Sequence, residues 1–128
     1  MSLKNPQCET LGVHLVPADR AQRRMIDGHR VCEAIAGLGD PDSVREWAQR
    51  FSLLGDPTRL VLLLCIHHGG PISVSDLAVA ADLTPAKVSQ ALRLLRAHGL
   101  VLAHRDGHVV RYQLADNTLH ALLAQISR

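Results

Sequence analysis

Residues 84–98 combine basic, amide and hydroxyl side chains at the spacing of a helix face. Lys87, Gln90 and Arg93 follow each other at i, i+3 and i+6, and Ser89 lies beside them. The opposite face would carry an apolar stripe of Val88, Leu92 and Leu95. Glutamine can pair with adenine and arginine or lysine with guanine, whereas hydroxyl groups often hold a phosphate. The pattern therefore predicts recognition of DNA.

Positive charge is concentrated in the same part of the chain. The whole sequence has a formal net charge of +2, whereas residues 84–114 hold five basic side chains and a single acidic one, Asp106. Such a local excess attracts phosphates. We predict that double-stranded operator DNA is contacted by Thr84, Lys87, Ser89, Gln90, Arg93, Arg96, Arg105, His108 and Arg111.

Two helices and a hairpin are predicted to position these side chains. A short helix begins at Ser73 or Ser75 and ends near residue 81. A three-residue turn then ends at Thr84, which with Pro85 suits the capped start of the helix to about residue 98. Helices joined in this way form a helix-turn-helix, whose second helix enters the major groove. Alternating apolar residues over 100–105 and 108–114, around Asp106-Gly107, predict a β-hairpin. The expected fold class is mainly α with a small β-hairpin wing, a winged helix-turn-helix.

Two further helices are expected before this unit. The polar stretch that Pro17 opens favours a helix to about Gly37, with scattered apolar packing residues. A helix over 43–54 would be capped by Asp42 or Ser43, because short polar side chains accept hydrogen bonds from the first free amides.

A central helix and a last helix complete the prediction. Asp56 and Pro57 suit the start of a helix over 57–68. This helix has apolar residues on almost all of its faces, so it should be buried. Asp116 or Asn117 would cap the last helix. We expect an N-terminal arm over residues 1–18 and one winged domain over 19–128.

Composition limits the class of protein. The 128 residues are 47% hydrophobic but only 2% aromatic, which favours packed helices over a β-sandwich. The three cysteines lack a C-x-x-C spacing, so a disulfide framework is not expected. No apolar run approaches the roughly 20 residues of a membrane span, and no signal-peptide pattern is present. We predict a cytoplasmic protein with no membrane partner.

The terminal helices carry more apolar surface than one small winged core would cover. This excess predicts a homodimer. The apolar residues concerned are Trp47, Phe51, Leu54, Leu119, Leu122, Leu123 and Ile126.

Successive landmarks of the chain resemble the ArsR/SmtB family of winged helix-turn-helix repressors. The resemblance covers about residues 43–123 and implies a symmetric dimer, built by the terminal helices, that represses a resistance or transport operon. It supports Ser89 and Gln90 as groove-facing residues, although many relatives have histidine at the position of Gln90. The landmarks are Gly55-Asp56-Pro57-Thr58-Arg59-Leu60, Val74-Ser75-Asp76-Leu77-Ala78, Val88-Ser89-Gln90-Ala91-Leu92-Arg93-Leu94-Leu95, Gly99-Leu100-Val101 and Arg105-Asp106-Gly107-His108.

The resemblance also implies a metal effector, because in many members a bound ion weakens operator binding. Cys8 and His14 are similar to the arm ligands of cadmium- and lead-sensing members, which reach the partner subunit. In the last helix Asp116 remains, Thr118 replaces a family histidine, and His120 lies one turn beyond Asp116. We therefore expect zinc, cadmium or lead to bind through Cys8, His14, Asp116 and His120.

Two other groups of ligand-type residues are weaker candidates. Asp27, His29 and Cys32 would place at most two ligands on one helix face. Cys65 falls in an apolar run and fits a core position, and the two histidines after it suit a helix C-terminus through their charge.

Three alternatives stay open. The regulator could be metal-independent, or respond to redox state through Cys8, Cys32 or Cys65, which requires an exposed thiol of low pKa. A small thiol enzyme would need a nucleophile, a base and an orienting group, and no such set is apparent, so we predict no enzyme. A protein-interaction module would leave the basic hairpin unexplained.

Overall fold

A computed structural model describes residues 15–127, so Cys8 and His14 lie outside the described part. The chain divides into two compact units, and the division falls after Trp47. The boundary expected after residue 18 separates an arm from the winged domain, and it stays a prediction.

From residue 15 to residue 26, the N-terminal unit has turns and not the expected helix. Helix α2 covers Gly28–Leu38, so the expectation of a helix from residue 17 is wrong for its first half. Arg20 N–H donates to the Pro17 carbonyl over 2.9 Å, a local turn bond. The Asp27 carboxylate then accepts hydrogen bonds from the amides of His29 and Arg30. Asp27 therefore acts as the helix cap, and the polar residues before it have no apolar stripe to pack.

Helix α3 covers Pro41–Leu54 and begins two residues earlier than predicted. The Asp40 carboxylate accepts from the amide of Asp42 over 3.2 Å, and its carbonyl accepts from Val44 over 3.1 Å. Proline suits the first helical position because its missing N–H would have no partner there. Asp40 takes the place of the predicted caps Asp42 and Ser43.

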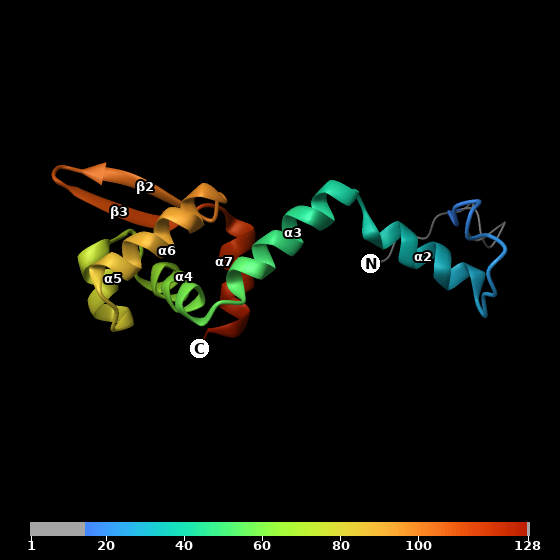
Figure 1. The fold of residues 1–128 in the computed structure, drawn as a ribbon, viewed down its shortest axis with the longest axis horizontal. Coiled ribbons are helices and arrows are strands. Elements are labelled where there is room, and N and C mark those ends of the chain that lie inside the picture. Colours follow the sequence, from blue (N-terminus) through green and yellow to red (C-terminus); the bar gives the residue numbers. More distant parts are fainter. Residues whose placement is uncertain (1–14, 128) are drawn as a thin grey trace. The chain divides into compact units, whose positions relative to one another are not determined.

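The C-terminal unit contains the predicted winged helix-turn-helix (Figure 1). Four helices follow the end of α3, together with three strands that form one antiparallel sheet in the order β1-β3-β2. The β2–β3 hairpin extends beyond the helices of this unit (Figure 1). The elements are α4 (Pro57–Gly69), β1 (Ile72–Ser73), α5 (Val74–Ala81), α6 (Pro85–Ala97), β2 (Val101–Asp106), β3 (Val109–Leu114) and α7 (Asn117–Ile126).

Side-chain oxygens begin four of these helices. Each oxygen accepts a hydrogen bond from the amide three residues later, which satisfies one of the free donors of the first turn. Thr84 Oγ1, for example, accepts from Lys87 N–H over 3.2 Å. The caps are Asp56, Ser73, Thr84 and Asp116, each of which was among the sequence predictions.

Strand β1 was not predicted. It has only two residues, and Ile72 and Ser73 pair with Tyr112 and Arg111 of β3. Close to this junction, a Cβ atom on Gly70 would lie 2.6 Å from the Ile66 carbonyl oxygen and 3.2 Å from that of Tyr112. Glycine thus allows the end of α4 to approach the sheet.

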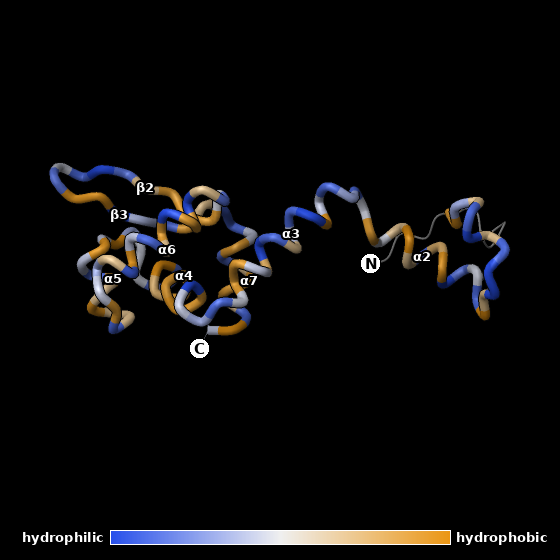
Figure 2. The backbone as a smooth tube through the Cα atoms, in the orientation of Figure 1, coloured by the Kyte–Doolittle hydropathy of each residue, from blue (hydrophilic) through white to orange (hydrophobic). Residues whose placement is uncertain are grey.

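The hydrophobic core of the C-terminal unit is built around α4. Figure 2 shows α4 as a largely hydrophobic segment, as its sequence predicts. Its buried side chains pack with those of the other helices and of the base of the hairpin. The largest fully buried side chains of this core are Leu62, Leu63, Ile66, Leu77, Val88, Leu92, Leu95, Leu100, Val101, Leu119 and Leu123.

Candidate nucleic-acid interface and candidate metal ligands

Helix α6 presents one polar face to solvent. Val88, Leu92 and Leu95 are buried in the core and therefore fix the rotation of the helix about its axis. The opposite side chains, which include all predicted groove-facing residues of this helix, are exposed. They are Lys87, Ser89, Gln90, Arg93 and Arg96.

The start of α6 favours an anion. Thr84 is exposed and caps the helix, and the amides of the first turn carry the positive end of the helix dipole. Within residues 15–127, no carboxylate forms an ion pair with Lys87, Arg93 or Arg96. The cations of this face can therefore bind phosphates without first breaking an ion pair within the protein.

The hairpin carries its basic residues on two faces. Arg105 pairs in register with Val110, and the neighbouring pair is His104 with Arg111. Because side chains alternate along a strand, Arg105 and Arg111 point to opposite faces of the hairpin. His108 is exposed in the turn beside Gly107, whose φ of 64° is the left-handed conformation that glycine adopts readily.

Arg111 has a partner that the sequence reasoning missed. Its Nε atom lies 3.5 Å from Asp106 Oδ2, and both side chains are on the same face of the hairpin as His104. The alternation of the two strands around Asp106-Gly107 was a usable signal, since it places residues 106 and 111 on one face. The single acid of the basic region is therefore an internal counter-charge.

Asp116 and His120 are engaged with different partners. Asp116 Oδ1 accepts the Leu119 amide over 2.8 Å, and Oδ2 lies 3.7 Å from Arg50 Nη1. His120 instead contacts His67 of α4, with 2.8 Å between their Nδ1 atoms. Among the residues that the structure describes, no three or more histidine, cysteine or acidic side chains gather as metal ligands.

Asp27, His29 and Cys32, the weaker candidate ligands of the N-terminal unit, each have a separate structural role. Cys32 is fully buried, and its sulfur lies 3.4 Å from the Leu15 amide nitrogen as a hydrogen-bond acceptor. His29 Nε2 lies 3.5 Å from Glu33 Oε1. Asp27 caps α2, and the hydrogen bond from the Arg30 amide is the main cause that lowers the pKa of its carboxyl group.

Cys65 is half-buried and packs against the core, as its place in an apolar run predicted. Burial raises the pKa of its thiol above the ordinary value, which disfavours the reactive thiolate. The burial of Cys32 and the raised pKa of Cys65 weigh against these two thiols as redox sensors.

His67 has a lowered pKa. Partial removal from water is the main cause, and the neighbouring imidazoles of His68 and His120 add to it. His67 was expected only to favour the C-terminus of its helix. Its contact with His120 was missed because the two residues are 53 positions apart.

The apolar residues predicted to form a dimer face divide into three groups by exposure, of which Trp47, Leu54 and Leu122 are half-buried. Leu119 and Leu123 are buried in the core of their own unit, so they are not available to a second chain. Phe51 and Ile126 are 54% and 56% exposed. A surface that packs against another molecule needs such exposed apolar side chains.

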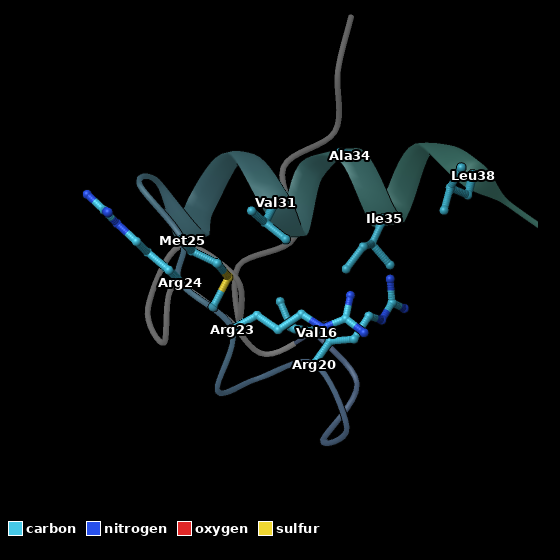
Figure 3. A pocket seen from close by; sticks show the side chains of 9 residues that line it. All are labelled: Val16, Arg20, Arg23, Arg24, Met25, Val31, Ala34, Ile35 and Leu38. Atoms are coloured by element: carbon cyan, nitrogen blue, oxygen red, sulfur yellow. The ribbon is translucent and has the colours of Figure 1, made fainter.

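The N-terminal unit holds an open groove of about 380 Å³ (Figure 3). Apolar side chains of α2 and of the preceding turns line it, together with arginines from those turns. Val31 and Ile35 project from α2 toward Val16 and Met25. The arginine residues are Arg20, Arg23 and Arg24.

None of the helices in the described part combines the length and the apolarity that crossing a membrane requires.

Comparison with known sequences agrees with the fold. A helix-turn-helix domain profile matches residues 54–103. A transcriptional repressor SmtB homolog from Synechocystis is 37% identical over 86 residues, which cover 67% of this chain and 64% of that protein. The HTH-type transcriptional regulator NmtR from Mycobacterium tuberculosis is 36% identical over 84 residues, which cover 66% of this chain and 69% of NmtR. This chain thus spans less than two thirds of the Synechocystis repressor.

Two solved structures have the same architecture. The cadmium metal-sensor CMTR from Mycobacterium tuberculosis has a TM-score of 0.56 and 37% identity, over 63% of this chain and 83% of CMTR. A homodimeric winged helix-turn-helix DNA-binding domain from Mycobacterium bovis has a TM-score of 0.61 and 26% identity, over 69% of this chain and 84% of that domain.

The fold and the exposed polar face of α6 define a winged helix-turn-helix protein. The similarity to NmtR and to the SmtB homolog then specifies the group. The chain belongs to the ArsR/SmtB family.

Proposed function

We propose that this protein is a cytoplasmic transcriptional repressor that binds double-stranded operator DNA as a homodimer. The observation that carries the proposal is the exposed face of α6, where amide and basic side chains lie opposite a buried stripe and beside a basic hairpin. The Synechocystis relative is named a transcriptional repressor, which supports the direction of the response.

Helix α6 and the hairpin would serve different purposes on the duplex. Gln90 lies in the first half of α6, where base edges are in reach when such a helix enters the major groove. Arg111 lies on the hairpin and would hold a phosphate, which carries no sequence information. Arg105 lies on the opposite face of the hairpin and would reach a different phosphate.

The test is DNA binding by Gln90→Ala and Arg111→Ala, measured by fluorescence anisotropy at several salt concentrations. The duplexes would be a sequence selected from a random pool and a scrambled control. Gln90→Ala should lose about 1–3 kcal/mol on the selected duplex and less on the control. Arg111→Ala should weaken both duplexes alike and reduce the salt slope by about one. Equal losses on both duplexes for both variants would contradict the assignment of α6.

A homodimer is supported by the exposed apolar residues near the ends of the winged unit, such as Ile126. Two α6 helices related by a two-fold axis would read an inverted repeat with half-site centres about 10–10.5 base pairs apart, or a multiple of this. Sedimentation equilibrium at micromolar concentration should give the mass of a dimer, and a monomer would contradict the proposal.

A divalent ion that releases the DNA is the second part of the proposal. The ligands would be Cys8 and His14 of the arm, with Asp116 and His120 of α7 as helpers. A thiolate selects soft ions and imidazole suits zinc, so this donor set fits zinc, cadmium or lead. The similarity to a cadmium sensor supports the class of ion. Asp116 Oδ1 accepts the Leu119 amide and Oδ2 pairs with Arg50, so an ion that binds Oδ2 would compete with the Arg50 guanidinium.

Cys8→Ser tests the arm. It should bind DNA normally and need a higher metal concentration for release, because the soft ligand is lost. An unchanged release midpoint would exclude the arm from sensing. A tenfold change in the release equilibrium corresponds to about 1.4 kcal/mol of coupling, so even an incomplete ligand set would give a measurable shift.

A further inference from the structure

Two histidines from separate helices converge on the surface of the C-terminal unit. His67 lies in the last turn of α4 and His120 at the end of the first turn of α7, and their Nδ1 atoms are 2.8 Å apart. The ring centroids are 4.8 Å apart and the ring planes are tilted by 58°. In the part of the chain that the structure describes, neither ring forms an ion pair with a carboxylate.

The short contact has a simple chemical meaning. One Nδ1 must carry the proton and donate it, while the other accepts through its lone pair. If the donor ring loses its Nδ1 proton to solvent and takes one up at Nε2, both rings are neutral with a lone pair on Nδ1, and the two lone pairs can bind one metal ion. With a Zn–N distance of about 2.0–2.1 Å, two tetrahedral nitrogen ligands lie roughly 3.3 Å apart, so the observed pair would open by about 0.5 Å.

The helices that carry the two imidazoles are held firmly. Ile66 and Leu119, the residues that adjoin His67 and His120 in the chain, are both buried in the core. The backbone is therefore arranged before any ion arrives, and small rotations of two surface side chains would suffice. A preorganised pair loses little conformational entropy when it binds.

We propose that His67 and His120 form a two-imidazole site for zinc, with water molecules as the remaining ligands. No third acidic, cysteine or histidine ligand joins the pair among residues 15–127, so this would be an open, exchangeable site. It uses a different set of ligands from the effector site proposed above, with His120 in common, and it joins α4 to α7 within one chain. It does not depend on DNA binding.

His68 provides a matched control. It adjoins His67 in sequence, and its ring packs edge-on against that of His67 with 4.7 Å between centroids. It is exposed and has no hydrogen bond to His120 in the described residues. Loss of His68 thus removes a nearby imidazole without removing either ligand.

The experiment is a zinc titration of the full chain, without DNA, followed by long-range ¹H–¹⁵N NMR of the histidine rings. It is done in a Cys8→Ser, His14→Ala background so that the arm binds no zinc. The Nδ1 resonances of His67 and His120 should shift together and saturate at one zinc per chain. His67→Ala or His120→Ala should weaken binding at least about tenfold, whereas His68→Ala should stay within about twofold.

Several outcomes would overturn the proposal. They are a shift of only one ring or of neither, a His68→Ala loss as large as that of His67→Ala, or binding unchanged in His120→Ala. Far-UV circular dichroism checks that each variant is folded, and His67→Gln, which keeps a polar side chain but no imidazole, provides a second variant. Because DNA is absent, failure of the proposed operator binding would leave the result of this titration unaffected.

Discussion

The two compact units of this chain differ in how far they stabilise themselves. In the described residues, every buried apolar side chain except Cys32 belongs to the unit from Ala48 onward. The N-terminal unit leaves Ile26 98% and Leu38 62% exposed. A helix in water needs an apolar face packed against something, because helix propensity alone is marginal at this length. The C-terminal unit meets this need within one chain, whereas α2 depends mainly on its cap and its groove.

The largest expected difference comes from removing one leucine from each unit. Leu63 is fully buried, so Leu63→Ala should lower the free energy of unfolding by about 2–5 kcal/mol through lost burial and a cavity. Leu38→Ala should change it by less than about 1 kcal/mol, since the side chain is mostly exposed. Urea unfolding at one fixed protein concentration measures both. Equal losses would mean that α2 is as well packed as α4.

Glycine-to-alanine substitutions should have opposite signs in the two units. Gly70→Ala would place a methyl group 2.6 Å from the Ile66 carbonyl oxygen and should destabilise by about 1–3 kcal/mol. Gly37 lies within α2 and a Cβ there meets nothing within 4 Å, so Gly37→Ala should stabilise by up to about 1 kcal/mol. Thermal unfolding of the two variants beside the parent decides the sign. Two losses would contradict the contrast.

Removal of a helix cap should affect the two units differently. Asp56→Ala deletes the acceptor for the Arg59 amide and should lower global stability by about 1 kcal/mol, because α4 is the central helix. Asp27→Ala should reduce the helical circular dichroism signal while the urea midpoint stays close to that of the parent. Such a result would show that α2 opens locally. A large midpoint change for Asp27→Ala would indicate that α2 belongs to the cooperative core.

The smallest expected effect is a pH dependence of α2. Hydrogen bonds to the charged form lower the pKa of Asp27 below 3.8, so the folded state holds its proton less tightly than the unfolded state. The contribution of Asp27 is therefore present above pH 3.8 and is lost as the pH falls through the lowered pKa. Asp27→Asn keeps a good cap that does not titrate. Its helical signal should change less with acid than that of the parent, and identical acid curves would contradict this cause.

Local chemistry was predicted well from the sequence. Asp56, Thr84 and Asp116 were identified as caps because a cap needs only a side-chain oxygen and an amide three residues later. The exposed face of α6 followed from the same logic, since Val88 and Leu92 repeat at the helical period. These features depend on neighbours along the chain.

Features that depend on distant partners were missed. Strand β1 has two residues, and its only reason to be extended is pairing with β3 about 40 positions later. The His67–His120 contact joins helices whose packing no local period reveals. The start of α2 was placed too early, because the polar stretch after Pro17 has no apolar repeat that would mark a boundary.

The ion pair between Asp106 and Arg111 means that the hairpin displays less charge than its composition indicates. Any polyanion that approaches Arg111 must take the place of a carboxylate that already occupies the same guanidinium. The exchange substitutes one anionic partner for another and does not neutralise a free cation. A single small anion that displaces Asp106 obtains little net binding free energy. A polymeric anion that contacts several cations at once still obtains binding free energy from the other contacts. Asp106 would thus make the hairpin discriminate by the length of its ligand.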